Sequence, residues 1–305
     1  MIRLLLTSGK YLPLKRTSTV FKKLVPFLPL YPEGILTSQT LYKKQNHTPA
    51  ISCENHLHQT KTDFLYFQTC IARTMGAYKE ESLSIPAVIM ELSSMVGIHL
   101  TVFKKNDELC CGMPFSSKGY HEASRTLLLK TLKILYEKSE EGRLPVLVDI
   151  SPCTYTFLHP NDEECKHIAS KLIFVDVVAF AAEYLISRWK QPVKKKDRVV
   201  LHPACSVRKM KLTEQLIKVA AFCANNVIVP DHAGCCGMAG DRGLMIPELT
   251  ASAQQRESCE VQKINACGHY SSSRTCEYSL TLQSGRSYES ILYLLYHTLK
   301  DASSK

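Results

Sequence analysis

Short apolar runs alternate with helical patterns along most of the chain. The runs that predict strands are rich in β-branched and aromatic residues, and they are Phe64–Phe67, Ile98–Phe103, Leu144–Ile150, Arg198–Leu201 and Val227–Val229. Between them apolar residues recur at helical spacing, most clearly over Gly119–Glu137. Strands that alternate with helices predict an α/β fold with mainly parallel strand pairing.

The chain contains an internal duplication. The tetrapeptide Cys-Cys-Gly-Met occurs at Cys110–Met113 and again at Cys235–Met238. Single cysteines flank each copy in corresponding places, and they are Cys70 and Cys153 in the first copy and Cys205 and Cys276 in the second. Chance recurrence of this whole pattern is very improbable. We therefore expect two units, 62–192 and 193–305, related by a pseudo-twofold axis, with Lys194–Asp197 marking their boundary.

Charge is concentrated in the first part of the chain. Residues 1–61 hold nine Lys or Arg against two acidic residues, whereas the remainder holds 29 basic against 26 acidic residues. A nucleic-acid-binding body would need its positive charge on the folded part, so no nucleic-acid partner is expected. We interpret residues 1–61, with prolines at 13, 26, 29 and 32, as a basic linker or leader. A mitochondrial-type transit peptide is an alternative, because the first 30 residues lack an acid.

Composition excludes other classes of protein. Hydrophobic residues make up 45% and charged residues 22% of the chain, which is ordinary for a globular protein. No apolar run approaches the roughly 18–20 residues that a membrane-spanning helix needs. We therefore expect no transmembrane segment.

Eight of the 13 cysteines fall in the duplicated pattern. Loops that follow parallel strands share one rim of a sheet, so the four cysteines of each unit are expected to converge there. Four thiolates repel one another unless a cation offsets them, which favours a metal or an iron–sulfur cluster as their ligand. Gly112 and Gly237 would let the backbone pass close to such a group. The predicted ligands are Cys70, Cys110, Cys111, Cys153, Cys205, Cys235, Cys236 and Cys276.

Two alternatives remain open for these cysteines. Structural zinc sites usually use C-x₂₋₄-C pairs, which the sequence lacks, although zinc remains possible with other spacings. A thiol–disulfide enzyme or purely structural thiols are the other alternative, but no Cys-x-x-Cys redox motif is present. The cysteines without a counterpart in the other unit are interpreted as structural, and they are Cys53, Cys165, Cys223, Cys259 and Cys267.

Four other residues are candidates for tuning a cluster. His202 and His232 each precede a predicted ligand by three residues, and they could donate hydrogen bonds or carry protons. Arg73 and Arg274 lie close to predicted ligands and could stabilise a negatively charged cluster. The alternatives are histidines that bind loop backbone groups and arginines that are solvated surface charges.

Longer motifs around these cysteines resemble a known family. The segments that carry the resemblance are Cys70–Gly76, Cys110–Gly119, His202–Ser206, Asp231–Gly243, Ser273–Glu277 and Ser284–Ile291. They are similar to the paired cysteine-rich CCG modules found in heterodisulfide reductase and in the iron–sulfur subunit of glycolate oxidase. They are similar above all to the C-terminal part of bacterial FAD-binding, iron–sulfur D-lactate dehydrogenases. The resemblance extends over about residues 62–299.

The resemblance implies an iron–sulfur electron-transfer component, with clusters of the four-iron type. Electrons from a D-2-hydroxy acid such as D-lactate or glycolate would pass from FAD on a partner chain, which also carries a ferredoxin-like domain, to a membrane quinone or cytochrome. The chain itself would supply no catalytic residue and would be inactive without its flavoprotein. The implied location is the cytoplasm, including the inner face of the cytoplasmic membrane. The alternatives are a heterodisulfide-reductase-like thiol–disulfide reductase and a non-catalytic metal-binding or interaction subunit.

The sequence departs from the family in two ways. Ile150 and Ser273 stand where the fullest family motif has the first Cys of Cys-x-x-Cys, so each unit offers four thiols rather than five. This departure argues against the non-cubane cluster of heterodisulfide reductase and leaves an ordinary four-iron cluster. The flavin domain and the ferredoxin-like motif are also missing. The chain is therefore expected to be either a separate subunit or the C-terminal fragment of a split gene, with residues 1–61 as a remnant of the ferredoxin-like part.

Overall fold

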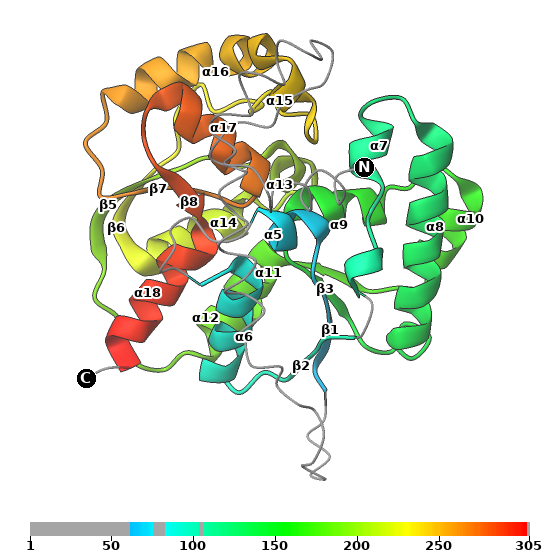
Figure 1. Ribbon diagram of the computed structural model, residues 1–305. Helices are drawn as coiled ribbons and strands as arrows, with labels where there is room; N and C mark the ends of the chain where they lie inside the picture. The colour runs from blue at the N-terminus through cyan, green and yellow to red at the C-terminus, as the bar shows by residue number, and fades with distance from the viewer. Residues whose placement is uncertain (1–61, 76–82, 104–105, 304–305) are drawn as a thin grey trace, which may run out of the picture.

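The computed structural model describes residues 62–75, 83–103 and 106–303, which form two similar α/β units (Figure 1). The predicted linker 1–61, and Cys53 within it, lie outside the described residues. Each unit contains a four-stranded sheet, with strand order β2-β1-β3-β4 in the first unit and β6-β5-β7-β8 in the second. All strand pairs are parallel. The prediction of a duplicated α/β fold with parallel sheets is confirmed.

The two sheets have equivalent strands in equivalent positions. The strands of the first sheet are β1 (Phe64–Phe67), β2 (Leu100–Thr101), β3 (Val146–Val148) and β4 (Phe174–Asp176). Those of the second sheet are β5 (Lys196–Leu201), β6 (Ala224–Ile228), β7 (His269–Ser271) and β8 (Tyr288–Ser290). In both, the first strand along the chain lies between the second and the third, so the strand order reverses between β1 and β3 and between β5 and β7. Ligands of open parallel sheets bind beyond the carboxyl ends of strands at such a reversal.

Strand prediction from apolar runs was incomplete. All five predicted runs contain strand residues, but β2 and β3 are shorter than predicted, and β6 begins earlier, at Ala224, and includes Asn225 and Asn226. Lys196 and Asp197 belong to β5 rather than to a boundary loop. Strands β4, β7 and β8 were not predicted. The sequences of β7 (HYS) and β8 (YES) are polar, and β4 runs directly into an apolar helix, so none of them forms an isolated apolar run.

Helices connect the strands and cover the sheets. Those of the first unit are α5 (Cys70–Thr74), α6 (Ile85–Met95), the 3₁₀-helix η1 (Asn106–Glu108), α7 (Met113–Ser116), α8 (His121–Lys138), α9 (Ser151–Leu158), α10 (Glu163–Ala169), α11 (Val177–Phe180), the π-helical turn η2 (Ala181–Leu185) and α12 (Ile186–Arg188). Those of the second unit are α13 (Cys205–Lys209), α14 (Thr213–Cys223), α15 (Arg242–Met245), α16 (Pro247–Gln262), α17 (Arg274–Ser284) and α18 (Ile291–Ser303).

Polar residues at strand ends begin several of these helices. The side chain of Thr69 accepts a hydrogen bond from the backbone of Ala72 and starts α5 immediately after β1. The carboxylate of Asp176 accepts from the backbone N–H of Val178 at 2.9 Å and starts α11. Such side-chain caps replace the hydrogen bonds that the first turn of a helix lacks. They therefore fix where each strand ends and its rim loop begins.

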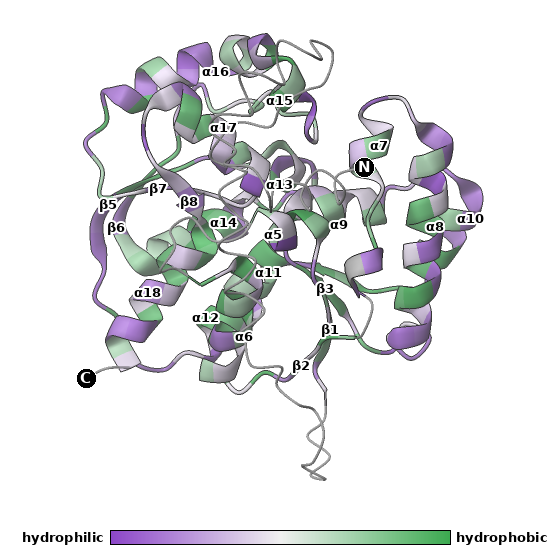
Figure 2. Cartoon of the chain, viewed as in Figure 1, coloured by the Kyte–Doolittle hydropathy of each residue, from purple (hydrophilic) through white to green (hydrophobic). Residues whose placement is uncertain are grey.

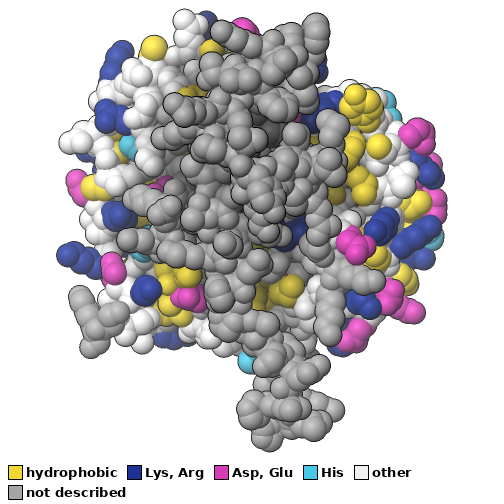
Figure 3. Space-filling view, viewed as in Figure 1, with side chains coloured by type: hydrophobic (Ala, Val, Ile, Leu, Met, Phe, Trp, Pro, Cys, Tyr) yellow, Lys and Arg dark blue, Asp and Glu magenta, His cyan; other side chains and the backbone are white. Residues whose placement is uncertain are grey.

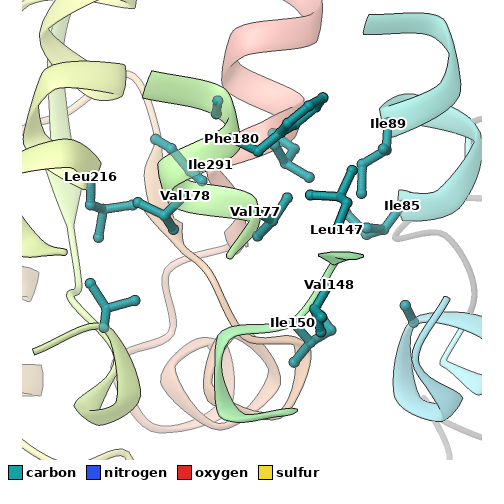
Figure 4. Close-up of a cluster of buried hydrophobic side chains, with 14 of the residues drawn as sticks. Ile85, Ile89, Leu147, Val148, Ile150, Val177, Val178, Phe180, Leu216 and Ile291 are labelled. Carbon is teal, nitrogen blue, oxygen red and sulfur yellow. The ribbon is translucent and has the colours of Figure 1, made fainter. Parts of the chain in front are cut away.

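The two units share one apolar core. Helix α18 of the second unit packs against α6 of the first, and α11 with η2 of the first packs against α14 of the second. These contacts correspond to each other under the duplication, as a pseudo-twofold relation requires. Figure 4 shows Val177 and Val178 lying between Leu216 on one side and Ile85 on the other, all of them buried. The helices between the sheets are accordingly mostly hydrophobic, whereas α16 on the outside is largely hydrophilic (Figure 2).

Charges of both signs are interspersed on the described part of the face shown in Figure 3. Ion pairs among the described residues include Arg125 with Asp162 at 2.6 Å and Lys133 with Glu164 at 2.8 Å. Within the described residues, no helix combines the length and apolar character that crossing a bilayer demands.

Candidate metal centre

Four thiols meet at the carboxyl edge of the first sheet. Cys70 is the first residue of α5 after β1, and Cys153 lies in the first turn of α9 after β3. The adjacent Cys110 and Cys111 lie on the loop that leads into α7. The sulfur of Cys70 is 3.7 Å from that of Cys110, and the sulfur of Cys111 is 3.3 Å from that of Cys153. We call these four residues the first site.

The second sheet carries an equivalent set of thiols. Cys205 begins α13 after β5, Cys276 lies in the first turn of α17 after β7, and Cys235 and Cys236 lie on the loop before α15. The sulfurs of Cys236 and Cys276 are 2.8 Å apart, and Cys205 hydrogen-bonds with Cys235. We call these four residues the second site. The structure thus brings together, in two groups, all eight cysteines that the duplication singled out, and their role as ligands stays a prediction.

Each site has an inner and an outer pair of thiols. The inner pairs, Cys111 with Cys153 and Cys236 with Cys276, are buried. The outer pair of the first site, Cys70 and Cys110, is half-buried, and in the second site Cys235 is exposed. A group bound at either site would therefore lie between the sheet edge and the surface, and the second site is the more open one.

One thiol in each site is the most acidic. The pKa of Cys110 lies well below the ordinary value, because Cys111 and Cys70 hydrogen-bond to its sulfur and the backbone N–H of Gly112 donates to it at 3.4 Å. The pKa of Cys235 is lowered in the same way, by hydrogen bonds from Cys205 and Cys236 and from the N–H of Gly237. The first cysteine of each adjacent pair is therefore the sulfur that is most readily available as a thiolate.

The glycine that follows each adjacent cysteine pair is required by packing and by the backbone conformation of its loop. Gly112 and Gly237 have φ angles of 82° and 73°, in the left-handed region. A Cβ on Gly237 would lie 2.5 Å from the backbone oxygen of Leu249, and one on Gly112 would lie 2.6 Å from that of Ser124. The space that a side chain would occupy is filled by α8 at Gly112 and by α16 at Gly237, so packing alone already requires glycine at both positions. The close approach of these loops to a cluster stays a prediction.

The substitution Gly237→Ala should destabilise the protein more than Gly285→Ala. Both glycines have left-handed φ angles, but nothing lies within 4 Å of a Cβ on Gly285. We expect Gly285→Ala to cost about 1–2 kcal/mol from backbone strain. We expect Gly237→Ala to cost about 1–3 kcal/mol more, because the methyl group overlaps backbone atoms. Denaturant midpoints of the two full-length variants test this difference, and equal midpoints would contradict it.

An arginine in each unit ties two cysteine-bearing segments together. Arg73 follows Cys70 by three residues, and its guanidinium donates to the carbonyl oxygen of Leu109 at 3.5 Å. Arg208 follows Cys205 by three residues and donates to the carbonyl oxygens of Ala233 and Gly234, at 2.7 Å for Ala233. These carbonyls belong to the segments that precede the adjacent cysteine pairs. Arg73 also lowers the pKa of Cys110, as a nearby positive charge should.

The two candidate histidines have different surroundings. His202 is buried, and its Nδ1 lies 2.7 Å from a carboxylate oxygen of buried Glu257. His232 has a side chain that is half exposed, and its Nδ1 lies 3.1 Å from Glu260 at the surface. The pKa of Cys235 is lowered mainly by hydrogen bonds from Cys205 and Cys236, and an electrostatic contribution from His202 is the smallest of the causes. His202 therefore interacts electrostatically with a cysteine of the second site, whereas His232 contacts the surface residue Glu260.

The fourth tuning candidate, Arg274, forms an ion pair with a carboxylate of its own helix. Its guanidinium lies 3.6 Å from Glu277, and both side chains are buried. Arg274 acts on the pKa of Tyr293, whose principal shift comes from burial. A tuning role for Arg274 stays a prediction.

Two buried carboxyl groups beside the first site were missed in the sequence. Asp149 accepts hydrogen bonds from the hydroxyl of Tyr66 at 2.9 Å and the backbone of Thr69 at 3.1 Å. Burial raises the pKa of Asp149 to about 6, although these donors oppose the shift. Asp176 is also buried, and burial raises its pKa to about 6. The signal was an acidic residue at the end of an apolar run, as in VLVD, which is unusual unless the carboxyl group has buried donors.

The remaining described cysteines do not join the two sites. Cys165 and Cys223 are buried, and burial raises the pKa of each thiol. Both agree with the interpretation of structural core cysteines. Cys259 and Cys267 are exposed and therefore do not contribute buried core packing.

The two cysteine sites adjoin across the contact between the units. Helix α9, which carries Cys153, packs against α13, which begins at Cys205. The Lys118 ammonium forms a 2.6 Å ion pair with Asp241, which links the segments that follow the two adjacent cysteine pairs. The ammonium of Lys209 also lies 5.1 Å from the centre of the Tyr155 ring. The carboxyl edges of both sheets therefore face one another.

The donors present fit an iron–sulfur cluster. Each site offers four sulfur atoms, the donors that iron–sulfur clusters use, on loops at the sheet edge. Within the described residues, no group of three or more His, Cys, Asp or Glu side chains is already arranged to hold a metal ion, and the site sulfurs contact one another instead. Metal binding would replace these sulfur–sulfur hydrogen bonds and release thiol protons. Cys70, Cys110, Cys111 and Cys153 would hold one group, and Cys205, Cys235, Cys236 and Cys276 the other.

Comparison with known proteins agrees with this arrangement. No curated protein that was compared with the chain matches it. The family model of the CCG cysteine-rich domain matches twice, over residues 64–157 and 199–281, which is more than half of the chain. Each match includes all four site cysteines of one unit; the first covers β1, β2 and β3, and the second runs from within β5 through β6 and β7. With two such domains in one chain, the protein belongs to the CCG cysteine-rich domain family.

Proposed function

We propose that this protein is an iron–sulfur electron-transfer component of an FAD-dependent dehydrogenase for D-2-hydroxy acids. The observation that carries the proposal is the repetition of the same four-thiol site at the carboxyl edges of two facing parallel sheets. The CCG domain is typical of iron–sulfur components of oxidoreductases, which supports the same function. Bound clusters would supply one-electron transfer at these sites.

The residues of the chain have defined tasks in this function. The eight site cysteines bind the clusters, and Arg73 and Arg208 fix the loops on which the adjacent pairs lie. Packing of α9 against α13 places the two sites next to each other, which suits electron transfer from one site to the other. The buried inner thiols exclude water from one side of each bound cluster, which leaves the outer side toward a partner.

The finer part of the proposal concerns partners and location. The motif resemblance supports D-lactate or glycolate as the substrate type of the whole complex, and an FAD-binding chain with a ferredoxin-like domain as the electron donor. A membrane quinone or cytochrome would accept the electrons. The proposed location is the cytoplasm at the inner face of the cytoplasmic membrane.

Anaerobic purification provides the direct test of the cluster. We expect a brown protein with broad charge-transfer absorption near ~400 nm and with both iron and acid-labile sulfide, because thiolate-bound clusters have these properties. Stoichiometric zinc without sulfide would reject electron transfer and favour the alternative of a non-catalytic metal-binding subunit.

A specific contact favours a second candidate function, thiol–disulfide reduction. The sulfurs of Cys236 and Cys276 lie only 2.8 Å apart, within reach of a disulfide bond. In such a reaction both thiols would lose a proton and an electron and form a disulfide, while a substrate disulfide would be reduced to two thiols. Reduction of one equivalent of a small disulfide by the reduced, cluster-free protein, lost in Cys276→Ser, would support this candidate. The absence of such reduction would leave electron transfer as the proposed function.

A further inference from the structure

Next to the second site in the sequence lies a buried histidine, His202, whose Nε2 has no hydrogen-bond partner among the described residues. His202 has a side chain with 0% exposure, and its Nε2 is buried without a partner within this part of the chain. An unpartnered buried polar nitrogen is costly unless it binds something that the protein alone does not supply. His202 therefore indicates a ligand at this position.

The hydrogen bond on the other ring nitrogen determines what kind of ligand fits. Nδ1 of His202 lies 2.7 Å from the carboxylate of Glu257. An ionised carboxylate accepts hydrogen bonds and cannot donate them, so Nδ1 is the donor in this contact. In a neutral imidazole the proton then lies on Nδ1, and Nε2 carries the lone pair. Histidines that bind metals usually have this arrangement, with a carboxylate that fixes the tautomer and the ring orientation. The Nε2 atom of His202 is thus suited to a metal ion rather than to a hydrogen-bond acceptor.

Two connections place this histidine beside the second site. His202 directly follows β5, and Cys205 comes three residues later, at the start of α13. The other carboxylate oxygen of Glu257 accepts a hydrogen bond at 3.4 Å from the backbone of Gly234, the residue before Cys235. The same carboxylate therefore orients both the histidine and the loop of the adjacent cysteine pair.

The corresponding position of the first site carries no nitrogen in its side chain. The residue that precedes Cys70 by three is Phe67, whose ring is fully buried and packs edge-on against Phe157 with ring centres 5.3 Å apart. The duplicated units therefore differ at this position, although their cysteines are equivalent. A phenyl ring offers no lone pair to a metal, whereas the imidazole of His202 does.

We infer that His202 is a nitrogen ligand of the metal centre of the second site, held in the binding tautomer by Glu257. The inference rests on the proposed function insofar as the metal centre is an iron–sulfur cluster. The second site then offers five donors, four sulfurs and one nitrogen, and the first site offers four sulfurs. The two centres are accordingly inequivalent, and Ser273, which replaces the family's fifth cysteine, does not reduce the second site to four donors.

Pulsed EPR of the full-length, cluster-loaded and reduced protein tests the inference. The wild type should show a strong nitrogen hyperfine coupling that changes from the ¹⁴N to the ¹⁵N pattern when histidine is labelled with ¹⁵N. His202→Gln should lose this coupling. His232→Gln should retain it, because that histidine is exposed and paired with Glu260. The absence of a histidine coupling in the wild type, or its persistence in His202→Gln, would overturn the inference. The labelled wild type needs no substitution, so misfolding of a variant does not obscure the result.

A second probe separates this inference from the proposed function. If the protein binds no iron and sulfide, the proposed function fails, and Co²⁺ alone is then added to the cluster-free protein. A ligand role for His202 predicts that the visible d–d spectrum of bound Co²⁺ differs between the wild type and His202→Gln but not between the wild type and His232→Gln. Identical spectra for all three would reject His202 as a ligand.

Discussion

Replacing Cys236 with Ser is expected to abolish the metal centre of the second site while the first site keeps its own. Cys236 is 4% exposed, and its sulfur contacts that of Cys276 at 2.8 Å, so its loss removes half of the buried inner pair. Serine fills a similar space but supplies a poor ligand for iron. If each site holds one cluster, iron content should fall by about half. Iron and sulfide analysis, together with the EPR signal of each site, measures this loss.

Matched variants make the test specific. Cys111→Ser removes the equivalent inner thiol of the first site and should delete the other EPR signal. Cys259→Ser changes an exposed cysteine on α16 and should leave iron content unchanged. If Cys259→Ser and Cys236→Ser lose equal amounts of iron, the assignment of ligands by duplication is wrong.

The grouping of the cysteines could be predicted because the chain shows the same arrangement twice. Each single cysteine follows a strand, and parallel strands place such residues on one edge. The duplication and the strand order are therefore enough to predict that Cys110 lies near Cys70, about 40 residues away, and that Cys235 lies near Cys205, about 30 residues away. Strands β7 and β8 were missed because their residues are largely polar. In β7 the buried Ser271 instead donates a hydrogen bond to the carbonyl of His202 at 2.9 Å, a contact that only the fold reveals.

The surroundings of the cysteines could not be predicted in the same way. Glu257 is 55 residues from His202 and lies on an outer helix whose sequence is ordinary for a solvated surface. In the folded protein α16 lies against the sheet edge, which leaves the Glu257 side chain only 2% exposed and directs its carboxylate toward His202. Burial of a charged residue depends on tertiary packing, so neither spacing nor composition reveals it.

Differences between the two units suggest different tasks for the two centres. The outer cysteines of the first site, Cys70 and Cys110, are half-buried, whereas the second site has the exposed Cys235 and the imidazole of His202. Under the proposed function, the more exposed second site would face the electron acceptor.

The isolated chain is expected to show no D-lactate:dye oxidoreductase activity, with or without added FAD. Oxidation of a D-2-hydroxy acid removes a hydride equivalent, which is two electrons, from the α-carbon. Iron–sulfur clusters carry one electron at a time and cannot accept a hydride. The sequence contains no Gly-x-Gly-x-x-Gly fingerprint for a dinucleotide, and its glycine-bearing loops at 112 and 237 pack against α8 and α16.

Activity should appear when a flavoprotein partner is added and a quinone or cytochrome serves as acceptor. It should then fall to the background rate in Cys111→Ser and in Cys236→Ser, because each substitution interrupts electron transfer at one site. Cys259→Ser should retain the activity of the wild type, since its thiol is exposed and outside both sites. Steady-state reduction of dye and of the quinone, measured side by side, distinguishes the steps: the flavoprotein alone should reduce the dye, and only the complex should reduce the quinone. Turnover of D-lactate by the isolated chain would require a catalytic site elsewhere in the protein, and electron transfer as its task would have to be abandoned.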